Sequence, residues 1–228
     1  MIATKFSFEN LSGGYGDTRI LSDISGSVSG GEVLGIFGRN GVGKTTLSRM
    51  LVGQIMTQSG IIKLNESDVT KTKNSLRRQL GVGYMPQTAM VFDGLTVKEN
   101  LSLAKGASGP DEFFELFPRL EERLNQQAGS MSGGERKILA FVRTMMEDTD
   151  VIVLDEPTEG VQQENITNME TCISRRKQAG SAVILAEQNL TMLLNMSDRF
   201  LGLDSGSLVY SGTRKSTKRH NLVEVLSV

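Results

Sequence analysis

The stretch Gly38-Arg39-Asn40-Gly41-Val42-Gly43-Lys44-Thr45 decides the fold of this chain. It follows an apolar run, Val33 to Phe37, and precedes a segment whose apolar residues recur at helical spacing. Glycines let the backbone adopt positive φ angles, so its N–H groups can curl around a polyphosphate while the following helix adds partial positive charge. The order strand, glycine-rich loop and helix is the context of a phosphate-binding loop, and it disfavours a loop that merely turns the chain. We therefore expect the chain to bind a nucleoside triphosphate.

Two residues at the end of this loop can complete such a site. Lys44 would reach the outer phosphates as a compact cation. The hydroxyl of Thr45 suits Mg²⁺, because this hard cation takes oxygen ligands and bridges the β- and γ-phosphates. The sequence therefore predicts that Mg²⁺ accompanies the nucleotide.

A pair of carboxylates ends a buried strand farther along the chain. Val151 to Leu154 is continuously apolar, as in a strand covered on both faces, and Asp155-Glu156-Pro157 follows directly. Ionised groups there must be paired or bound to metal. We predict that Asp155 holds Mg²⁺ through its water shell and that Glu156 orients or deprotonates an attacking water. Two surface acids at a strand end are the alternative, which the phosphate loop disfavours.

Length and composition limit the possible folds, partners and cellular compartments of this protein. With 228 residues, 38% of them hydrophobic, the chain can bury one α/β core with a smaller attached subdomain. The net charge of −1 gives no reason to expect nucleic acid as a partner. The single cysteine, Cys172, excludes an internal disulfide framework and fits a reducing compartment. No stretch approaches the roughly 18 to 20 apolar residues that cross a bilayer, and we expect an intracellular protein.

Alternating residues predict half-buried strands near the N-terminus. Met1 to Leu11 alternates, Gly13 to Asp17 is expected to break this strand, and Ile24 to Val28 alternates again. Tyr15 is then either an ordinary loop aromatic or an exposed ring that stacks on a base. The remaining strands are expected at residues 61–65, 81–85, 151–154 and 182–186, and a hairpin at 199–210 closes the sheet.

The segment from Thr88 to Gly129 is expected to be a small helical insertion. Thr96 and Glu99 form a predicted capping box, and a Phe- and Leu-rich patch follows. Ser132-Gly133-Gly134 then precedes a helical run from Glu135 to Met146. This second glycine-rich helix start is either another anion site or a plain helix cap by Ser132, and the motif alone leaves both open.

Taken together and in this order, the motifs resemble the ATPase subunit of an ABC transporter. They are the phosphate loop, Gln87 after a strand, the helix start at 132–135 and the strand that ends in Asp155-Glu156-Pro157-Thr158. The ordered set is highly specific and spans nearly the whole chain. The resemblance implies an α/β phosphate-loop NTPase fold with a mixed central sheet, N-terminal antiparallel strands and an inserted helical subdomain. It implies one ATPase domain over 1–228, with a core at 1–87 and 147–228 and the helical subdomain at 88–146.

The resemblance also implies roles for individual residues. ATP would be bound by Tyr15, stacked on adenine, and by Gly38, Arg39, Asn40, Gly41, Val42, Gly43, Lys44, Thr45 and Thr46. The metal ligands would be Thr45, Gln87 and Asp155, and the catalytic residues Glu156, Gln188 and Gln87. The family signature, which binds the γ-phosphate of a nucleotide held by the opposite subunit, would be Met131, Ser132, Gly133, Gly134 and Glu135.

A paired arrangement also follows from the residues. Two phosphate nests on one chain, separated by the sheet and the inserted helices, cannot easily serve one nucleotide. Two chains arranged head to tail could each complete the other's site. Dimerisation would then depend on ATP, and hydrolysis would remove the phosphate that bridges the halves.

Within the family, the sequence is most similar to ATPase subunits of branched-chain amino acid importers, followed by urea and short-chain amide importers. Glu115 to Leu120 runs into a signature that opens with Met131 and closes with Glu135. Gln188 stands where most members carry a histidine, and the only histidine of the chain is His220. Gln188 is thus expected to contact the γ-phosphate as a neutral donor that cannot titrate. As a departure from most members, Gln162 replaces an aspartate in the loop after Glu156.

The resemblance therefore implies an ATP-hydrolysing importer subunit on the inner face of the cell membrane. Its expected partners are polytopic permease subunits, a second ATPase subunit that is either a copy or a relative, and indirectly a solute-binding protein. A DNA-repair or chromosome-organising ATPase is a competing class, but the short stretch between Thr45 and Met131 leaves no room for its long coiled coil. A non-transport ABC protein of the scaffold or translation type is another, although the translation type carries two ATPase units in one chain.

Overall fold

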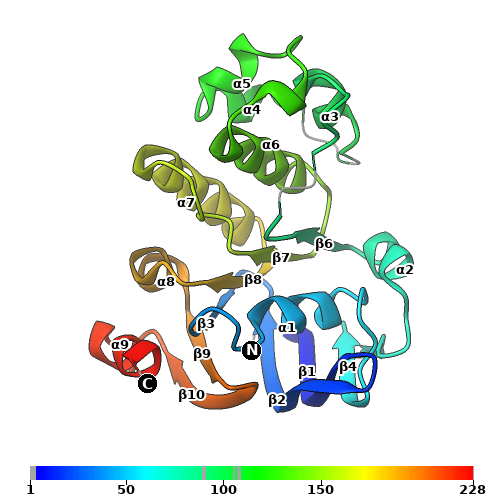
Figure 1. Cartoon of the computed structure of the whole chain (residues 1–228), viewed down its shortest axis with the longest axis vertical. Helices are drawn as coiled ribbons and strands as arrows, with labels where there is room; N and C mark the ends of the chain where they lie inside the picture. Colours follow the sequence, from blue (N-terminus) through cyan, green and yellow to red (C-terminus); the bar gives the residue numbers. More distant parts are fainter. Residues whose placement is uncertain (1–3, 89–90, 105, 107–108, 228) are drawn as a thin grey trace.

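Two β-sheets form the lower part of the molecule (Figure 1). The computed structural model describes residues 4–88, 91–104, 106 and 109–227. The first sheet is antiparallel, with strand order β2-β1-β4-β5. Its strands are β1 (Thr4–Tyr15), β2 (Thr18–Ser29), β4 (Ser59–Leu64) and β5 (Ser67–Asp68). The expectation of N-terminal antiparallel strands is confirmed.

The second sheet carries the predicted phosphate loop and has the order β10-β9-β3-β8-β7-β6. All neighbours are parallel except β9 and β10, so the predicted mixed sheet and its closing hairpin are confirmed. The strands are β3 (Val33–Phe37), β6 (Val82–Met85), β7 (Val151–Asp155), β8 (Ala182–Glu187), β9 (Arg199–Asp204) and β10 (Ser207–Thr213). Every residue of β3, β7 and β8 is buried, as their continuous apolar sequences require.

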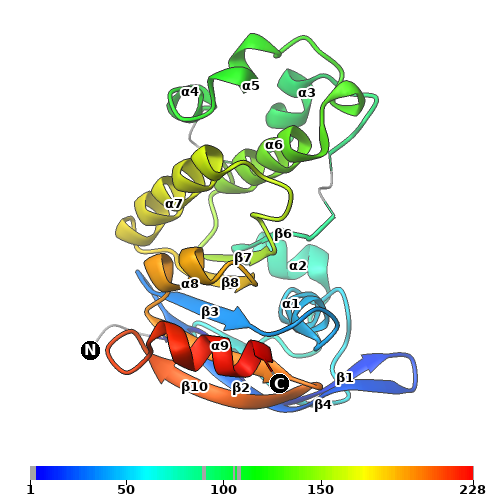
Figure 2. The same cartoon turned by 60° about the vertical axis from the view of Figure 1, so that its left-hand side comes forward.

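Helices cover both faces of the parallel sheet. Helix α1 (Lys44–Leu51) lies between the two sheets, where its apolar side chains join those of β1, β3 and β7 in one core. On the opposite face, α6 (Gly133–Met145) and α7 (Gln163–Gln178) pack over β7 and β8 in a second core (Figure 2). The helices on or near the sheets are α2 (Asn74–Gln79), α7 (Gln163–Gln178), α8 (Leu190–Met196) and α9 (Arg219–Ser227).

The inserted segment forms a helical lobe above the sheets (Figure 1). It contains α3 (Val97–Ser102), α4 (Asp111–Phe114), α5 (Pro118–Glu122), the 3-10 turn Ala128–Ser130 and α6 (Gly133–Met145). The capping box of Thr96 and Glu99 is present at the start of α3. Of the predicted insertion, residues 89–90, 105 and 107–108 lie outside the described part of the chain.

Three local expectations need correction. Strand β1 does not break at Gly13 but continues to Tyr15, because Gly13, Gly14 and Tyr15 pair with β2 through irregular registers that glycine tolerates. Helix α8 was not expected, although Asn189 caps it by accepting hydrogen bonds from two of its backbone N–H groups. From Asn221 onward the sequence predicts one amphipathic turn or a frayed end, but the described structure has a nine-residue helix there, α9.

Candidate functional site

The glycine-rich loop and the predicted catalytic and metal-binding residues lie at the carboxyl ends of four neighbouring parallel strands. The glycine-rich loop follows β3, Gln87 follows β6, Asp155 and Glu156 end β7, and Gln188 follows β8. The register places Phe37 beside Glu187 and Asp155 beside Ala186, which brings these ends to one edge. In open α/β sheets, ligands bind outside this edge.

The backbone of the loop has the shape that a polyphosphate requires. Gly41 has a φ of 84° and Gly43 a φ of 110°, values that an L side chain rarely adopts. No atom lies within 4 Å of a Cβ built on Gly41, so the loop is open at this position. Helix α1 begins directly after Gly43, and the N–H groups of its first turn lack partners within the helix. The loop therefore offers donors and positive charge to an anion.

Lys44 lies inside this loop and is almost fully buried. Its Nζ donates hydrogen bonds to the carbonyl oxygens of Gly38 and Arg39, both at 2.9 Å. It also lies 3.1 Å from Oε1 of Glu156, and the two side chains are only 3% and 6% exposed. The ammonium group is thus held at the centre of the site by oxygen atoms alone.

Three side-chain oxygens beside Lys44 form a set that fits Mg²⁺. Oγ1 of Thr45 lies 3.3 Å from Oε1 of Gln87 and 3.3 Å from Oδ1 of Asp155. Tyr84 donates to the other oxygen of Asp155 at 3.4 Å. Hydroxyl, amide and carboxylate oxygens are ligands that Mg²⁺ accepts. The donor chemistry at Thr45, Gln87 and Asp155 therefore agrees with the predicted metal ligands.

The charge of Asp155 is costly without a cation. The residue is completely buried. Burial raises the pKa of the Asp155 carboxyl to about 6; the Thr45 hydrogen bond opposes this rise and the negative charge of Glu156 adds to it. A divalent cation at this position would favour the ionised form instead.

Glu156 occupies a constrained position beside this oxygen set. Its φ of 48° is unusual for a residue with a side chain, and its N–H donates to the carbonyl of Ala186 at 2.8 Å. Two amides hold its carboxylate: Nε2 of Gln87 donates at 2.9 Å and Nε2 of Gln188 at 3.0 Å. The structure thus brings the three predicted catalytic residues into direct contact.

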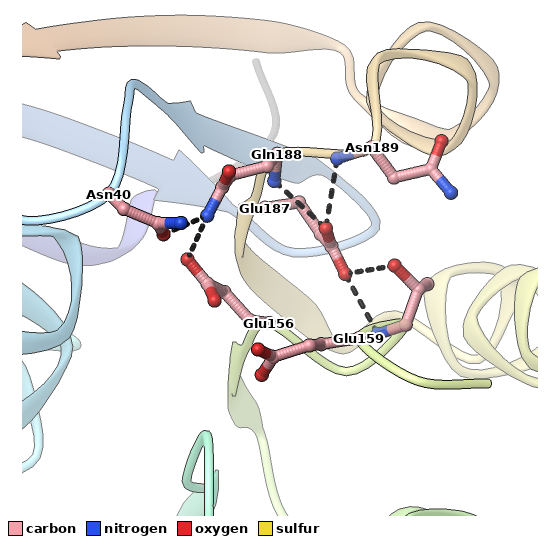
Figure 3. Close-up of a pocket in the computed structure, with 7 residues that line it drawn as sticks. Asn40, Glu156, Glu159, Glu187, Gln188 and Asn189 are labelled. Carbon is pink, nitrogen blue, oxygen red and sulfur yellow. Dashed lines mark hydrogen bonds between the residues drawn. The ribbon is translucent and has the colours of Figure 1, made fainter. Parts of the chain in front are cut away.

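A cavity of about 210 Å³ opens beside Glu156 and Gln188 (Figure 3). Gln188 points into it and also donates a hydrogen bond to Oδ1 of Asn40 in the glycine-rich loop. The other lining residues are Thr158, Glu159, Glu187 and Asn189. A second cavity, about 380 Å³, adjoins it and is lined by Arg39, Asn40, Gln188 and Leu226 of α9.

The other predicted nucleotide residues differ in exposure. Tyr15 is 45% exposed at the end of β1, and its hydroxyl accepts a hydrogen bond from Arg49 of α1 at 3.0 Å. Arg39 is exposed, whereas Val42 and Thr46 are buried in the described structure. Tyr15 is therefore partly exposed next to α1, whereas Val42 and Thr46 are buried beneath the surface.

The predicted signature forms the start of α6, in the upper lobe of Figure 2. Ser132 and Glu135 make a complete capping box, with Oγ of Ser132 accepting from the Glu135 N–H and the Glu135 carboxylate accepting from the Ser132 N–H. Glu135 also pairs with Arg119 and Arg123. The helix-cap reading is thus confirmed, and anion binding there stays a prediction. Among the described residues, no hydrogen bond or ion pair joins Met131, Ser132, Gly133, Gly134 or Glu135 to the glycine-rich loop.

Sequence reasoning missed Glu187, which is 2% exposed at the end of β8. Its carboxylate accepts hydrogen bonds from Thr158, Gln188 and Asn189. An acidic residue that ends a buried apolar strand was the available signal, because the same pattern identified Asp155.

Comparison with known proteins gives consistent matches over most of the chain. The family described as "ABC transporter" matches residues 21–159. The "High-affinity branched-chain amino acid transport ATP-binding protein BraG" of Pseudomonas aeruginosa is 35% identical, covering 91% of this chain and 92% of that protein. The "Probable branched-chain amino acid transport ATP-binding protein LivF" of Archaeoglobus fulgidus is 31% identical and covers 95% of each.

A relative named for export has nearly the same sequence identity to this chain. The "Lipopolysaccharide export system ATP-binding protein LptB" of Haemophilus influenzae is 30% identical, covering 90% of this chain and 89% of that protein. A solved structure titled "Structure of ATP binding subunit of ABC transporter" superimposes with a TM-score of 0.84 at 26% identity, covering 99% of this chain and all of that one.

Proposed function

Because this chain belongs to the ABC transporter family, we propose that it binds and hydrolyses ATP as the energy-coupling subunit of a solute importer. The observation that carries the proposal is the convergence at one sheet edge of a buried ammonium, Lys44, and the carboxylates of Asp155 and Glu156. The geometry supports a triphosphate on the glycine-rich loop, with its outer phosphates against Lys44.

The residues at this edge of the sheet are proposed to have different roles in ATP hydrolysis. Lys44 exchanges the carbonyls of Gly38 and Arg39 for phosphate oxygens and neutralises their charge. Thr45, Gln87 and Asp155 would hold Mg²⁺, which when bound supplies further charge neutralisation on the phosphates. The contacts of Lys44, Thr45, Gln87 and Asp155 support these proposed roles.

Glu156 is proposed as the general base. Its carboxylate accepts a proton from the attacking water as that water approaches the γ-phosphate. Gln87 and Gln188 contact this carboxylate from two sides, so both can fix its direction. Gln188 also donates to Oδ1 of Asn40 in the loop, which supports its proposed role as a neutral donor to the γ-phosphate.

A second subunit is proposed to complete the site. The start of α6 presents Ser132 and two glycines, and it lies in a lobe apart from α1 (Figure 2). In a head-to-tail pair, this helix start would meet the nucleotide of the partner and Tyr15 would stack on the adenine of its own nucleotide. The pairing subunit is either a copy of this chain or a relative.

The names of two relatives support branched-chain amino acids as the solute. BraG and LivF are both named for that transport and are 35% and 31% identical to this chain. Export is the second candidate, because a lipopolysaccharide-export relative reaches 30% identity over a similar length. Urea or amide import is a third assignment that the sequence resemblance leaves open.

Membrane subunits would be separate chains. No helix in the described part of this chain combines the length and the apolar composition needed to span a bilayer. We propose that the chain docks on the cytoplasmic face of polytopic permease subunits. A solute-binding protein would then act on those subunits rather than on this chain.

Copurification followed by reconstitution tests the transport assignment. The full chain is captured with its membrane partners, the complex is placed in proteoliposomes, and ATP turnover is measured with leucine, isoleucine, valine, urea or lipopolysaccharide. We expect stimulation by the branched-chain amino acids and none in the Lys44→Ala complex. Stimulation by urea alone, or by a lipid substrate alone, would replace the solute assignment while keeping the ATPase role.

A further inference from the structure

Glu187 is a buried carboxylate at the end of β8 to which the proposed mechanism gives no role. Its Oε1 accepts from the N–H of Thr158 at 2.8 Å and from the Thr158 hydroxyl at 2.6 Å. Its Oε2 accepts from the N–H groups of Gln188 at 2.9 Å and Asn189 at 3.0 Å. Figure 3 shows these bonds on the wall of the cavity beside Glu156. The ion pairs of the described residues do not include Glu187, so its charge is balanced by these four donors.

The two oxygens of this carboxylate serve two different loops. Oε1 holds the loop that follows Glu156, and Oε2 holds the loop that contains Gln188. A carboxylate has about four acceptor positions, and Glu187 uses four. Both oxygens of Glu187 therefore act as acceptors, one for each loop.

The first loop needs this support because Glu156 has a strained backbone. Its φ of 48° lies in the left-handed region, which costs free energy in a residue with a side chain. The N–H of Glu156 is fixed to Ala186 of β8, and two residues later Thr158 is fixed to Glu187 of the same strand. The strained residue is thus held between two attachments to β8.

The second loop is fixed in a similar way around Gln188. Glu187 accepts from the backbone of Gln188 and Asn189, and Asn189 in turn caps α8 by accepting from Thr191 and Met192 at 3.1 Å. The backbone of Gln188 is therefore anchored, while its side chain reaches Oε1 of Glu156 at 3.0 Å.

We propose that Glu187 is a positioning residue that fixes the Glu156 carboxylate and the Gln188 amide relative to each other by accepting hydrogen bonds from both of their loops. The inference rests on the proposed function, which assigns Glu156 and Gln188 their roles. Misplacement of a reacting group by about 1 Å can cost about 100-fold in rate. The hydrogen bonds of Glu187 can therefore affect turnover although Glu187 itself does not contact the nucleotide.

Glu187→Gln in the full chain tests the proposal with two readouts. The amide keeps one carbonyl oxygen but presents an NH₂ group to one pair of donors, so one loop loses its acceptor. Hydrogen exchange should then accelerate at least about tenfold in the nucleotide-free protein in whichever loop loses its acceptor, at the Thr158 amide or at the Gln188 and Asn189 amides. Turnover should fall by about 10- to 100-fold with ATP affinity within about twofold of wild type. Glu9→Gln, at an exposed glutamate of β1, is the matched control and should change neither readout.

A double variant separates positioning from a general loss of stability. If Glu187 acts through Gln188, Glu187→Gln should lower the turnover of a Gln188→Ala chain by no more than about threefold. Thr158→Val removes the hydroxyl and should change exchange and turnover in the same direction as Glu187→Gln. Thr158→Ser keeps the hydroxyl and should restore near wild-type values.

Two results would overturn the proposal. One is wild-type exchange of the three amides in both Glu187→Gln and Thr158→Val; the other is a turnover loss by Glu187→Gln that is equally large in the Gln188→Ala chain. A wild-type chain that hydrolyses no ATP would contradict the proposed function, whereas the exchange result still decides whether Glu187 holds the two loops.

Discussion

Nζ of Lys44 lies 3.1 Å from Oε1 of Glu156, and both side chains are almost completely buried. The cation proposed to bind phosphate is therefore paired, before ATP arrives, with the carboxylate proposed to act as base. Such a buried pair is stabilised by mutual attraction that is lost when one partner is removed. If the outer phosphates of ATP bind Lys44 as proposed, they compete with Glu156 for its ammonium group, so nucleotide binding and release of the proposed base would be linked.

Glu156→Gln should keep ATP binding and lower turnover. The amide preserves the size of the side chain but keeps one acceptor oxygen for the two donors Gln87 and Gln188, and it cannot accept a proton from water. We expect turnover to fall by about 10²- to 10⁴-fold, with ATP bound at least as tightly because the competing carboxylate is gone. Equilibrium binding and steady-state hydrolysis measure the two effects, with Glu9→Gln as the control; unchanged turnover would remove the role assigned to Glu156.

Lys44→Ala should abolish nucleotide binding. The change removes the ammonium at the centre of the loop and leaves the Glu156 carboxylate without its cation, so phosphate meets uncompensated negative charge. Titration with a fluorescent ATP analogue measures the affinity. Lys71→Ala, at an exposed lysine, should bind as wild type. Normal affinity in Lys44→Ala would contradict the assignment of the loop.

The nucleotide-free protein should lose stability as the pH rises through the range in which Asp155 ionises. Burial raises the pKa of Asp155 to about 6, above its usual value of about 4, so between these values the folded state holds a proton that the unfolded state has released. Unfolding stability must then decrease with rising pH over this window. The contribution of Asp155 is at most about 3 kcal/mol.

Asp155→Asn isolates this contribution because asparagine cannot titrate. Urea unfolding of both proteins from pH 4.5 to 6.5, without nucleotide or metal, should show a stability difference that shifts in favour of Asp155→Asn as the pH rises. Asp17→Asn, at an exposed position, should follow wild type. A difference independent of pH would show that Asp155 is ionised throughout the range.

Arg77→Met should destabilise the fold without touching the candidate site. Arg77 is 1% exposed, and its guanidinium donates to the carbonyls of Met50 and Leu51 at the end of α1 and to those of Thr70 and Thr72. Methionine fills similar space but leaves these buried carbonyls without donors. We expect a loss of about 2–4 kcal/mol in urea unfolding. Arg219→Met at an exposed position is the control, and a loss below about 0.5 kcal/mol in Arg77→Met would contradict this account.

Much of the site could be predicted because its residues are tied to strand ends. Continuous apolar runs located β3, β7 and β8, and the polar residues that follow them had to meet at one edge. The capping box of Thr96 and Glu99 depends on residues three positions apart and was predicted, whereas for Ser132 only a plain helix cap was considered, without the reciprocal bond of Glu135.

The features that were missed depend on contacts between distant segments. The pairing of Lys44 with Glu156 joins residues from two loops, and the bonds of Glu187 to Thr158 follow from the packing of β7 beside β8. Strand β1 continues through Gly13 and Gly14 because these residues pair with β2, and the local sequence does not reveal this pairing. Helix α8 is short and its capping Asn189 stands next to site residues, which concealed its role as a helix start.

The central claim is that the loop from Gly38 to Thr45 holds the phosphates of ATP, and a crystal structure of the Glu156→Gln chain with ATP and Mg²⁺ tests it most directly. We predict phosphate oxygens within hydrogen-bond distance of the backbone N–H groups of this loop, Lys44 turned from residue 156 to the outer phosphates, and Mg²⁺ beside Thr45 and Gln87. Nucleotide bound elsewhere, with Lys44 still on the carbonyls of Gly38 and Arg39, would contradict the account.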